Sequence, residues 1–128
     1  MTCLLDTHFL VWIVMGSGRL RRYRWLEGYR PWGVSPASLL EIQFLSELGR
    51  LKVTNPAFTE TLKRDPRFQL DDVSLVTLVE KALSVGWTRD PFDRLLAAHS
   101  LVRRTPLCTL DERASVEHAL IVPELGGR

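Results

Sequence analysis

Four carboxylates stand in the sequence where they could act together on a metal ion. They are Asp6, Glu41, Asp93 and Asp111. Two of them end short apolar runs, one follows the start of an expected helix, and one lies among leucines in a helical pattern. An unpaired carboxylate costs on the order of several kcal/mol to bury, and four in one crevice repel one another. Because a hard divalent cation relieves that repulsion, activates water and neutralises charge on a phosphodiester, the pattern indicates a Mg²⁺ or Mn²⁺ site.

Each carboxylate also has a purely structural explanation. Asp6, Asp90 and Asp111 all precede expected helices, where an aspartate side chain caps free backbone N–H groups. Asp93 would be the third residue of its helix, where a negative charge suits the helix dipole. Glu41 could be an ordinary charge on a helix flank. Capping does not explain why both apolar runs stop at aspartate or why Glu41 lies beside an apolar stripe, so the joint pattern favours a shared site.

The expected elements alternate between short apolar runs and helical patterns. We expect strands over residues 2–5, 32–34, 68–70, 107–110 and 120–122, and helices over 7–15, 19–28, 36–48, 55–64, 73–85, 91–103 and 111–119. This alternation predicts a three-layer α/β/α fold with a parallel sheet. Because open sheets of this kind bind ligands at the carboxyl ends of their strands, Asp6 and Asp111 should lie at the crevice.

Capping residues predict where several helices begin. Ser35 followed by Pro36, and Asp90 followed by Pro91, are typical of an N-cap and first helical position. Asp72 is expected to cap the helix over 73–85.

Length and composition indicate one domain, expected over 1–125, with a flexible tail over 126–128. The 128 residues are 45% hydrophobic, and the formal net charge of +2 is too small for a strong nonspecific nucleic-acid binder. Cys3 and Cys108 do not make a disulfide framework, and we expect buried, reduced thiols. Without a signal peptide or an apolar run long enough to cross a bilayer, a cytoplasmic location with no membrane association is expected.

Four segments resemble the four motifs of PIN-domain ribonucleases, most closely the VapC-type toxins of toxin–antitoxin (VapBC-type) pairs. The segments are residues 4–8, 35–42, 89–98 and 109–111. They occur in the family's order and spacing and together extend over nearly the whole chain. Thr88 departs from the pattern, because close members carry histidine there, and residues 63–86 match only loosely.

By this resemblance, the four carboxylates match the family's acidic metal-binding and catalytic quartet. Thr109 matches a polar residue near the metal, and Asp90 matches a supporting acid. The resemblance implies a five-stranded parallel sheet of order 3-2-1-4-5, which puts the strands of Asp6 and Asp111 side by side. It also implies a Mg²⁺- or Mn²⁺-dependent endoribonuclease in which metal-activated water hydrolyses RNA phosphodiesters. A homodimer and a cognate antitoxin that blocks the crevice are implied as partners.

Arginine side chains are candidates for contact with RNA, although most arginines simply lie on solvated surfaces. Arg89, Arg94 and Arg113 are the candidates nearest the acidic motifs. The aromatic residues Trp12, Tyr23, Trp25 and Trp32 could belong to the core, to a dimer face or to an antitoxin groove.

Two other classes of function stay open. One is a non-catalytic PIN-like module that binds RNA or protein, against which the intact quartet argues. The other is a metal-dependent DNA nuclease or phosphatase, which substrate comparison would separate. His8, His99 and His118 lack paired metal-ligand spacing and are not expected as ligands. The absence of a phosphate-binding glycine loop and of a nucleophile elbow excludes nucleotide-cofactor and serine-hydrolase readings.

Overall fold

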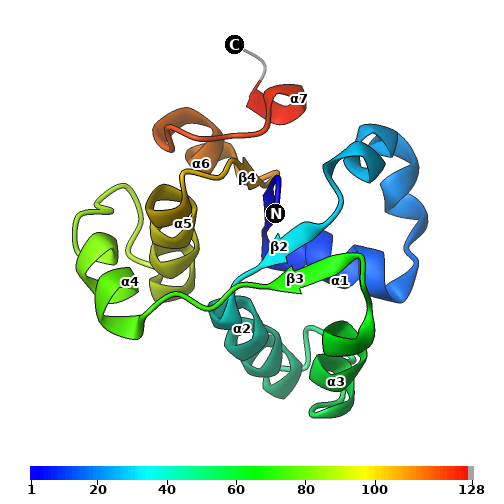
Figure 1. The fold of residues 1–128 in the computed structure, drawn as a ribbon. Coiled ribbons are helices and arrows are strands. Elements are labelled where there is room, and N and C mark those ends of the chain that lie inside the picture. The colour runs from blue at the N-terminus through cyan, green and yellow to red at the C-terminus, as the bar shows by residue number, and fades with distance from the viewer. Residues whose placement is uncertain (127–128) are drawn as a thin grey trace.

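The two apolar runs that precede Asp6 and Asp111 form neighbouring strands of one sheet, in a computed structural model that describes residues 1–126 (Figure 1). β1 (Leu4–Leu5) lies between β2 (Trp32–Val34) and β4 (Leu107–Cys108), and β3 (Phe68–Leu70) lies beyond β2. All pairs are parallel, and the order β3-β2-β1-β4 reverses between β1 and β4. The site is therefore expected at this switch point.

The fifth strand expected over 120–122 is reduced to one parallel bridge between Leu107 and Ile121. The pairing stops because Pro123 has no N–H to donate and begins α7 (Pro123–Gly126). The expectation of five strands is thus corrected to four, in an order that matches the first four of the expected 3-2-1-4-5. Gly126 of the expected tail belongs to α7, and residues 127–128 of that tail lie outside the described residues.

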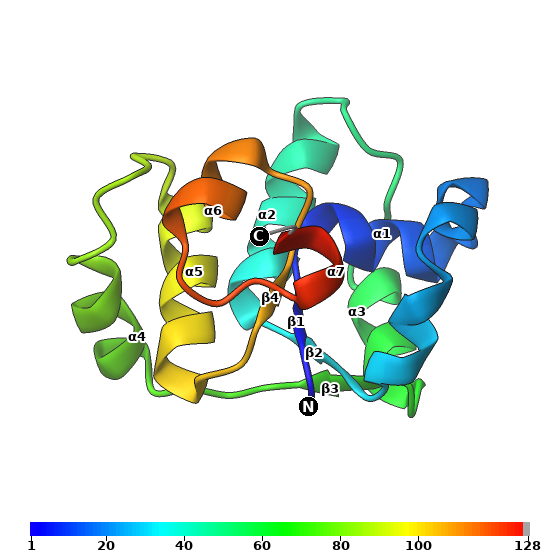
Figure 2. The same ribbon diagram turned by 90° about the horizontal axis from the view of Figure 1, so that it is seen from above.

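Helices pack on both sides of the strands, which confirms the α/β class. The remaining α-helices are α1 (Thr7–Met15), α2 (Pro36–Glu47), α3 (Ala57–Arg64), α4 (Leu75–Ala82), α5 (Pro91–Arg103) and α6 (Glu112–Glu117). Figures 1 and 2 show α4 and α5 on one side of the strands and α1 and α3 on the other. None of the described helices is both long and apolar enough to cross a membrane.

The basic segment expected as one helix over 19–28 forms two 3₁₀ helices, η1 (Gly18–Arg22) and η2 (Arg24–Tyr29). Tyr23 interrupts them with a non-helical backbone (φ −124°, ψ 45°). Its ring packs edge-on against Phe9 at a centroid distance of 5.2 Å and against Trp25 at 6.1 Å. These tertiary contacts replace the continuous apolar stripe that a single surface helix would need.

The start of α4 differs from the expectation. Ser74, not Asp72, caps the helix, because the Ser74 hydroxyl accepts the backbone N–H of Thr77 at 3.4 Å. The backbone carbonyl of Asp72 instead accepts a hydrogen bond from Arg103 at 2.9 Å, so this stretch is drawn toward α5. The helix consequently begins at Leu75, two residues later than expected.

The centre of the core demands a close approach between β1 and β2. A Cβ atom on Gly33 would lie 2.9 Å from the backbone oxygen of Cys3 and 2.2 Å from the sulfur of Met1, so only glycine fits. Cys3 and Cys108 are free and fully buried. Because Cys108 pairs with Leu5, the two cysteines are offset by two residues along their strands.

A buried polar network joins β3, α2 and α5. His99 is fully buried, and its Nδ1 lies 2.9 Å from the hydroxyl of Ser35. Its Nε2 lies 2.7 Å from a carboxylate oxygen of Asp71, which also accepts a hydrogen bond from Arg103 at 2.7 Å. Burial alone would raise the pKa of Asp71, but the hydrogen bonds from His99 and Arg103 outweigh it and lower that pKa. Since Ser35 is also fully buried, this serine–histidine–aspartate set has no access to substrate and serves to hold α2 against α5.

Candidate active site

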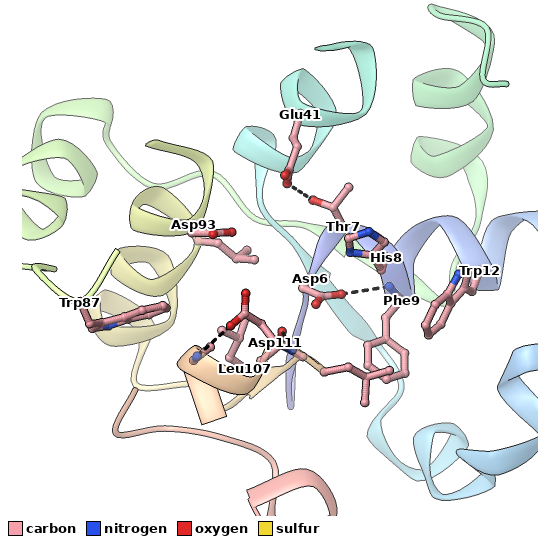
Figure 3. A pocket seen from close by; sticks show the side chains of 14 residues that line it. Asp6, Thr7, His8, Phe9, Trp12, Glu41, Trp87, Asp93, Leu107 and Asp111 are labelled. Carbon is pink, nitrogen blue, oxygen red and sulfur yellow. Dashed lines mark hydrogen bonds between the residues drawn. The ribbon is translucent and has the colours of Figure 1, made fainter. Parts of the chain in front are cut away.

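One cavity of about 320 Å³ at the carboxyl ends of β1 and β4 is lined by all four predicted carboxylates (Figure 3). Asp6 directly follows β1, Asp111 lies three residues after the end of β4, and the other two come from α2 and α5. Figure 3 shows Asp6 near the centre, with Glu41, Asp93 and Asp111 around it. Residues more than a hundred positions apart in the sequence therefore meet at one edge of the sheet, as the strand order requires.

Asp6 is positioned by its own backbone and by the helix that it begins. Its N–H donates to the carbonyl of Cys108 at 3.0 Å, and its carboxylate accepts the N–H of Phe9 at 3.0 Å, capping α1. Burial raises the pKa of Asp6, although hydrogen bonds from Phe9 and from the side chain of Thr109 oppose that rise. Asp6 thus caps a helix and lines the cavity, so the structural and functional explanations coexist.

Glu41 is turned toward α1 rather than toward bulk solvent. The hydroxyl of Thr7 donates a hydrogen bond to its Oε1. The helix that carries it is fixed by the Ser35 cap and by the fully buried Ile42 next to it. Burial raises the pKa of Glu41 above its ordinary value, and the nearby charges of Asp90 and Asp6 raise it further.

Asp93 lies in the first turn of α5 and lines the cavity. Asp90 caps this helix by accepting the N–H groups of Phe92 at 2.8 Å and Asp93 at 3.2 Å. Burial raises the pKa of Asp93 from 3.8 to about 7, with further contributions from the charges of Asp90 and Glu41. Asp90 itself does not line the cavity, but its charge acts on two carboxylates that do.

Asp111 and Thr109 complete the cavity at the end of β4. The carboxylate of Asp111 accepts the N–H of Ala114 at 3.0 Å and so caps α6. The N–H of Asp111 donates to the hydroxyl of Thr109 at 3.1 Å, and Thr109 is only 3% exposed. The hydroxyl of Thr109 therefore links Asp6 and Asp111, the two aspartates that come after β1 and β4.

The donor set fits a hydrated divalent cation. All four acids in the cavity offer carboxylate oxygens. Burial raises the pKa values of Asp6, Glu41 and Asp93, and repulsion between carboxylates adds to the rise for Glu41 and Asp93, which a cation would relieve. Within residues 1–126, however, no three His, Cys, Asp or Glu side chains are grouped closely enough to hold an ion directly. Asp6 and Asp111 each use an oxygen for capping. This arrangement suits Mg²⁺, which keeps several waters and needs only one or two direct carboxylates.

The arginines proposed from the sequence do not line the cavity. The Nε of Arg94 donates to the carbonyl of Thr88 at 2.8 Å, and the side chains of Arg89 and Arg113 are exposed to solvent. His99 belongs to the buried network, and His118 pairs with the Ser100 hydroxyl at 2.9 Å.

Sequence reasoning missed several residues that do line the cavity, namely Thr7, His8, Trp12 and Trp87. For Thr7 and His8, adjacency to Asp6 was a usable signal. The two tryptophans carried no such signal, because the burial of an aromatic side chain cannot be judged from sequence alone.

Comparison with known proteins identifies a matching family and a similar solved structure. The family model described as the PIN domain matches residues 3–117. Among solved structures, the fold is similar to a chain described as a toxin–antitoxin complex from Klebsiella pneumoniae, with a TM-score of 0.64 and 16% sequence identity. That alignment covers 94% of this chain and 95% of the other, and at such low identity it establishes a likeness of fold. The sequence matches no curated protein.

Proposed function

This chain belongs to the PIN-domain family, and from that premise we propose that it is a Mg²⁺- or Mn²⁺-dependent endoribonuclease, the VapC-type toxin of a toxin–antitoxin pair. PIN domains are generally nucleases, which supports a hydrolase. The observation that carries the proposal is the set of four carboxylates around one cavity at the switch point of the sheet.

Asp6, Glu41, Asp93 and Asp111 would hold the cation, directly or through water. When bound, the cation neutralises charge on the phosphodiester and activates the attacking water. The chain itself fixes the ligands in place. The Phe9 N–H orients Asp6, the Thr7 hydroxyl orients Glu41, and the Ala114 N–H orients Asp111.

The protonation of the Asp93 carboxyl depends on whether a cation is bound. With a pKa of about 7 it is partly protonated at neutral pH in the absence of a cation, and a bound cation would favour its ionised form. No nucleophilic side chain is required.

The test is cleavage of RNA with and without EDTA, by the wild type and by Asp6→Asn. Asparagine keeps the capping oxygen of Asp6, so the fold should survive while cleavage is abolished. Asp72→Asn, which changes an exposed aspartate outside the cavity, is the matched control and should cleave normally. Full metal-dependent activity in Asp6→Asn would contradict the proposal. Preference for DNA or for a phosphomonoester would reassign the substrate.

A cognate antitoxin and a second copy of the chain are the proposed protein partners, acting in the cytoplasm. The similarity of fold to a toxin–antitoxin complex supports the antitoxin. Exposed apolar side chains on α4 and at its C-cap support association between copies. These side chains are Leu75, Val76, Val79 and Leu83, which are between 41% and 74% exposed. Sedimentation of the wild type and of Leu83→Glu tests the dimer, because a wild type that stays monomeric would contradict it.

A further inference from the structure

Two tryptophans stand on opposite sides of the acidic cavity. Trp12 comes from α1 and Trp87 from the loop that precedes α5, and both line the cavity. Figure 3 shows the carboxylates between the two indole rings. Both side chains are only partly buried, so each retains accessible surface beside the site.

A basic depression adjoins the cavity on the Trp12 side. It is lined by Trp12, Arg19, Arg22 and Tyr23, so Trp12 lines both hollows. The Arg19 guanidinium lies 5.4 Å from the centre of that ring. Arg19 and Arg22 are exposed, and neither forms an ion pair with a residue in the described part of the chain. Their positive charge is therefore free to meet a phosphate.

The cavity alone would repel a nucleic acid. Four carboxylates face the position of the reacting phosphate, and a bound divalent cation offsets only part of their charge. Unpaired arginines next to the cavity supply the attraction that the strand needs outside it. Exposed aromatic rings beside basic side chains are the usual means of holding a single strand, since each base can stack on a ring.

We propose that Trp12 and Trp87 stack the bases on either side of the scissile phosphate, and that the strand continues from Trp12 over Arg19 and Arg22. This inference rests on the proposed function for the identity of the cleaved bond. It requires a single-stranded substrate, because the bases of a duplex already stack on one another and cannot reach the rings. Trp12 and Trp87 would then determine the specificity for single-stranded over duplex RNA.

The test measures binding without cleavage, by the fluorescence anisotropy of a labelled single-stranded oligoribonucleotide in EDTA. Trp12→Ala and Trp87→Ala should each weaken binding about tenfold, while affinity for the same sequence in a duplex stays unchanged. Trp12→Phe keeps an aromatic face and should lose less. Trp25→Ala is the matched control, because Trp25 is also partly buried but lines neither hollow. Circular dichroism confirms that each variant is folded.

The arginines are tested by the salt dependence of the same binding. Each lost phosphate contact lowers the slope of log affinity against log salt by about 0.7 for a single strand, so Arg19→Gln with Arg22→Gln should lower it by about 1.4. The control pair, Arg50→Gln with Arg64→Gln, replaces exposed arginines outside both hollows and should leave the slope unchanged.

The outcomes separate this inference from the proposed function. A protein that binds single-stranded RNA through Trp12 and Trp87 but cleaves none would refute the nuclease proposal and leave the stacking inference standing. If both alanine variants bind single-stranded RNA as tightly as the wild type, the stacking inference is overturned, and the Trp12 face is left to a protein partner. Equal losses on duplex and single strand would overturn it too.

Discussion

Replacing Asp93 by asparagine should stabilise the metal-free protein at neutral and alkaline pH. Burial, followed by the charges of Asp90 and Glu41, raises the pKa of this carboxyl from 3.8 to about 7 in the folded protein. Between those two values the folded state holds a proton that the unfolded chain releases. The free energy of unfolding therefore falls as pH rises through this window, and the full penalty persists above pH 7.

The size of the effect follows from the two pKa values. The difference between 3.8 and about 7 corresponds to at most about 4 kcal/mol of unfolding free energy. Because Asp93 is only half-buried, solvent screening lowers this to about 1–2 kcal/mol. Asparagine has nearly the same size and cannot ionise, so the variant should gain about that much at about pH 8 and nothing at about pH 4.

Urea unfolding of EDTA-treated protein at both pH values measures the gain. Asp72→Asn is the control, because Asp72 is exposed and should change stability little at either pH. Adding Mg²⁺ should stabilise the wild type more than Asp93→Asn, since the variant has lost a ligand. The reasoning is refuted if Asp93→Asn is less stable than the wild type at about pH 8, or gains equally at both pH values.

Three further changes test the supports of the site. His99→Ala leaves a buried carboxylate short of a partner and should lower the free energy of unfolding by about 3–5 kcal/mol; a loss under about 1 kcal/mol in urea would contradict the network. Gly33→Ala forces a Cβ to within 2.9 Å of a backbone oxygen and should cost about 1–3 kcal/mol, whereas Gly28→Ala, with open space around it, should not show this loss in thermal melts. Asp90→Ser keeps a capping oxygen but removes a charge, so it should lower the pKa of Asp93 in an NMR titration; an unchanged pKa would argue against their coupling.

Local signals in the sequence predicted much of this fold. Asp6, Ser35 and Asp90 each cap the helix that was expected to follow, because capping depends only on residues a few positions away. The predicted start of α4 was wrong because several polar residues there could cap the helix. A hydrogen bond from Arg103 of another helix to the Asp72 carbonyl decides which of them does. The predicted fifth strand was too long because its pairing with β4 competes with the helix that begins at Pro123.

The sequence predicted the acidic residues of the candidate site but not the aromatic residues that line the same cavity. Asp6 and Asp111 follow strands, so strand order alone brings them to one edge. The prediction that Glu41 lies beside them depended on the joint pattern of the four carboxylates and on the family resemblance. Trp12 and Trp87 were beyond prediction, because which face of an aromatic ring stays accessible depends on packing that no local pattern encodes.

The two cysteines give this protein built-in reporters of strand separation. Burial raises the pKa of Cys3 to about 12 and that of Cys108 further still, so neither thiol ionises while the sheet is closed. The thiolate is the form of cysteine that attacks an alkylating reagent, so alkylation must wait until β1 and β4 part. Asp6 directly follows β1, so opening of this strand would also disturb the acidic site. The alkylation rate, measured by mass spectrometry without an engineered label, would show how often β1 separates from β4. Comparing the rates with and without Mg²⁺ would show whether the cation suppresses that opening.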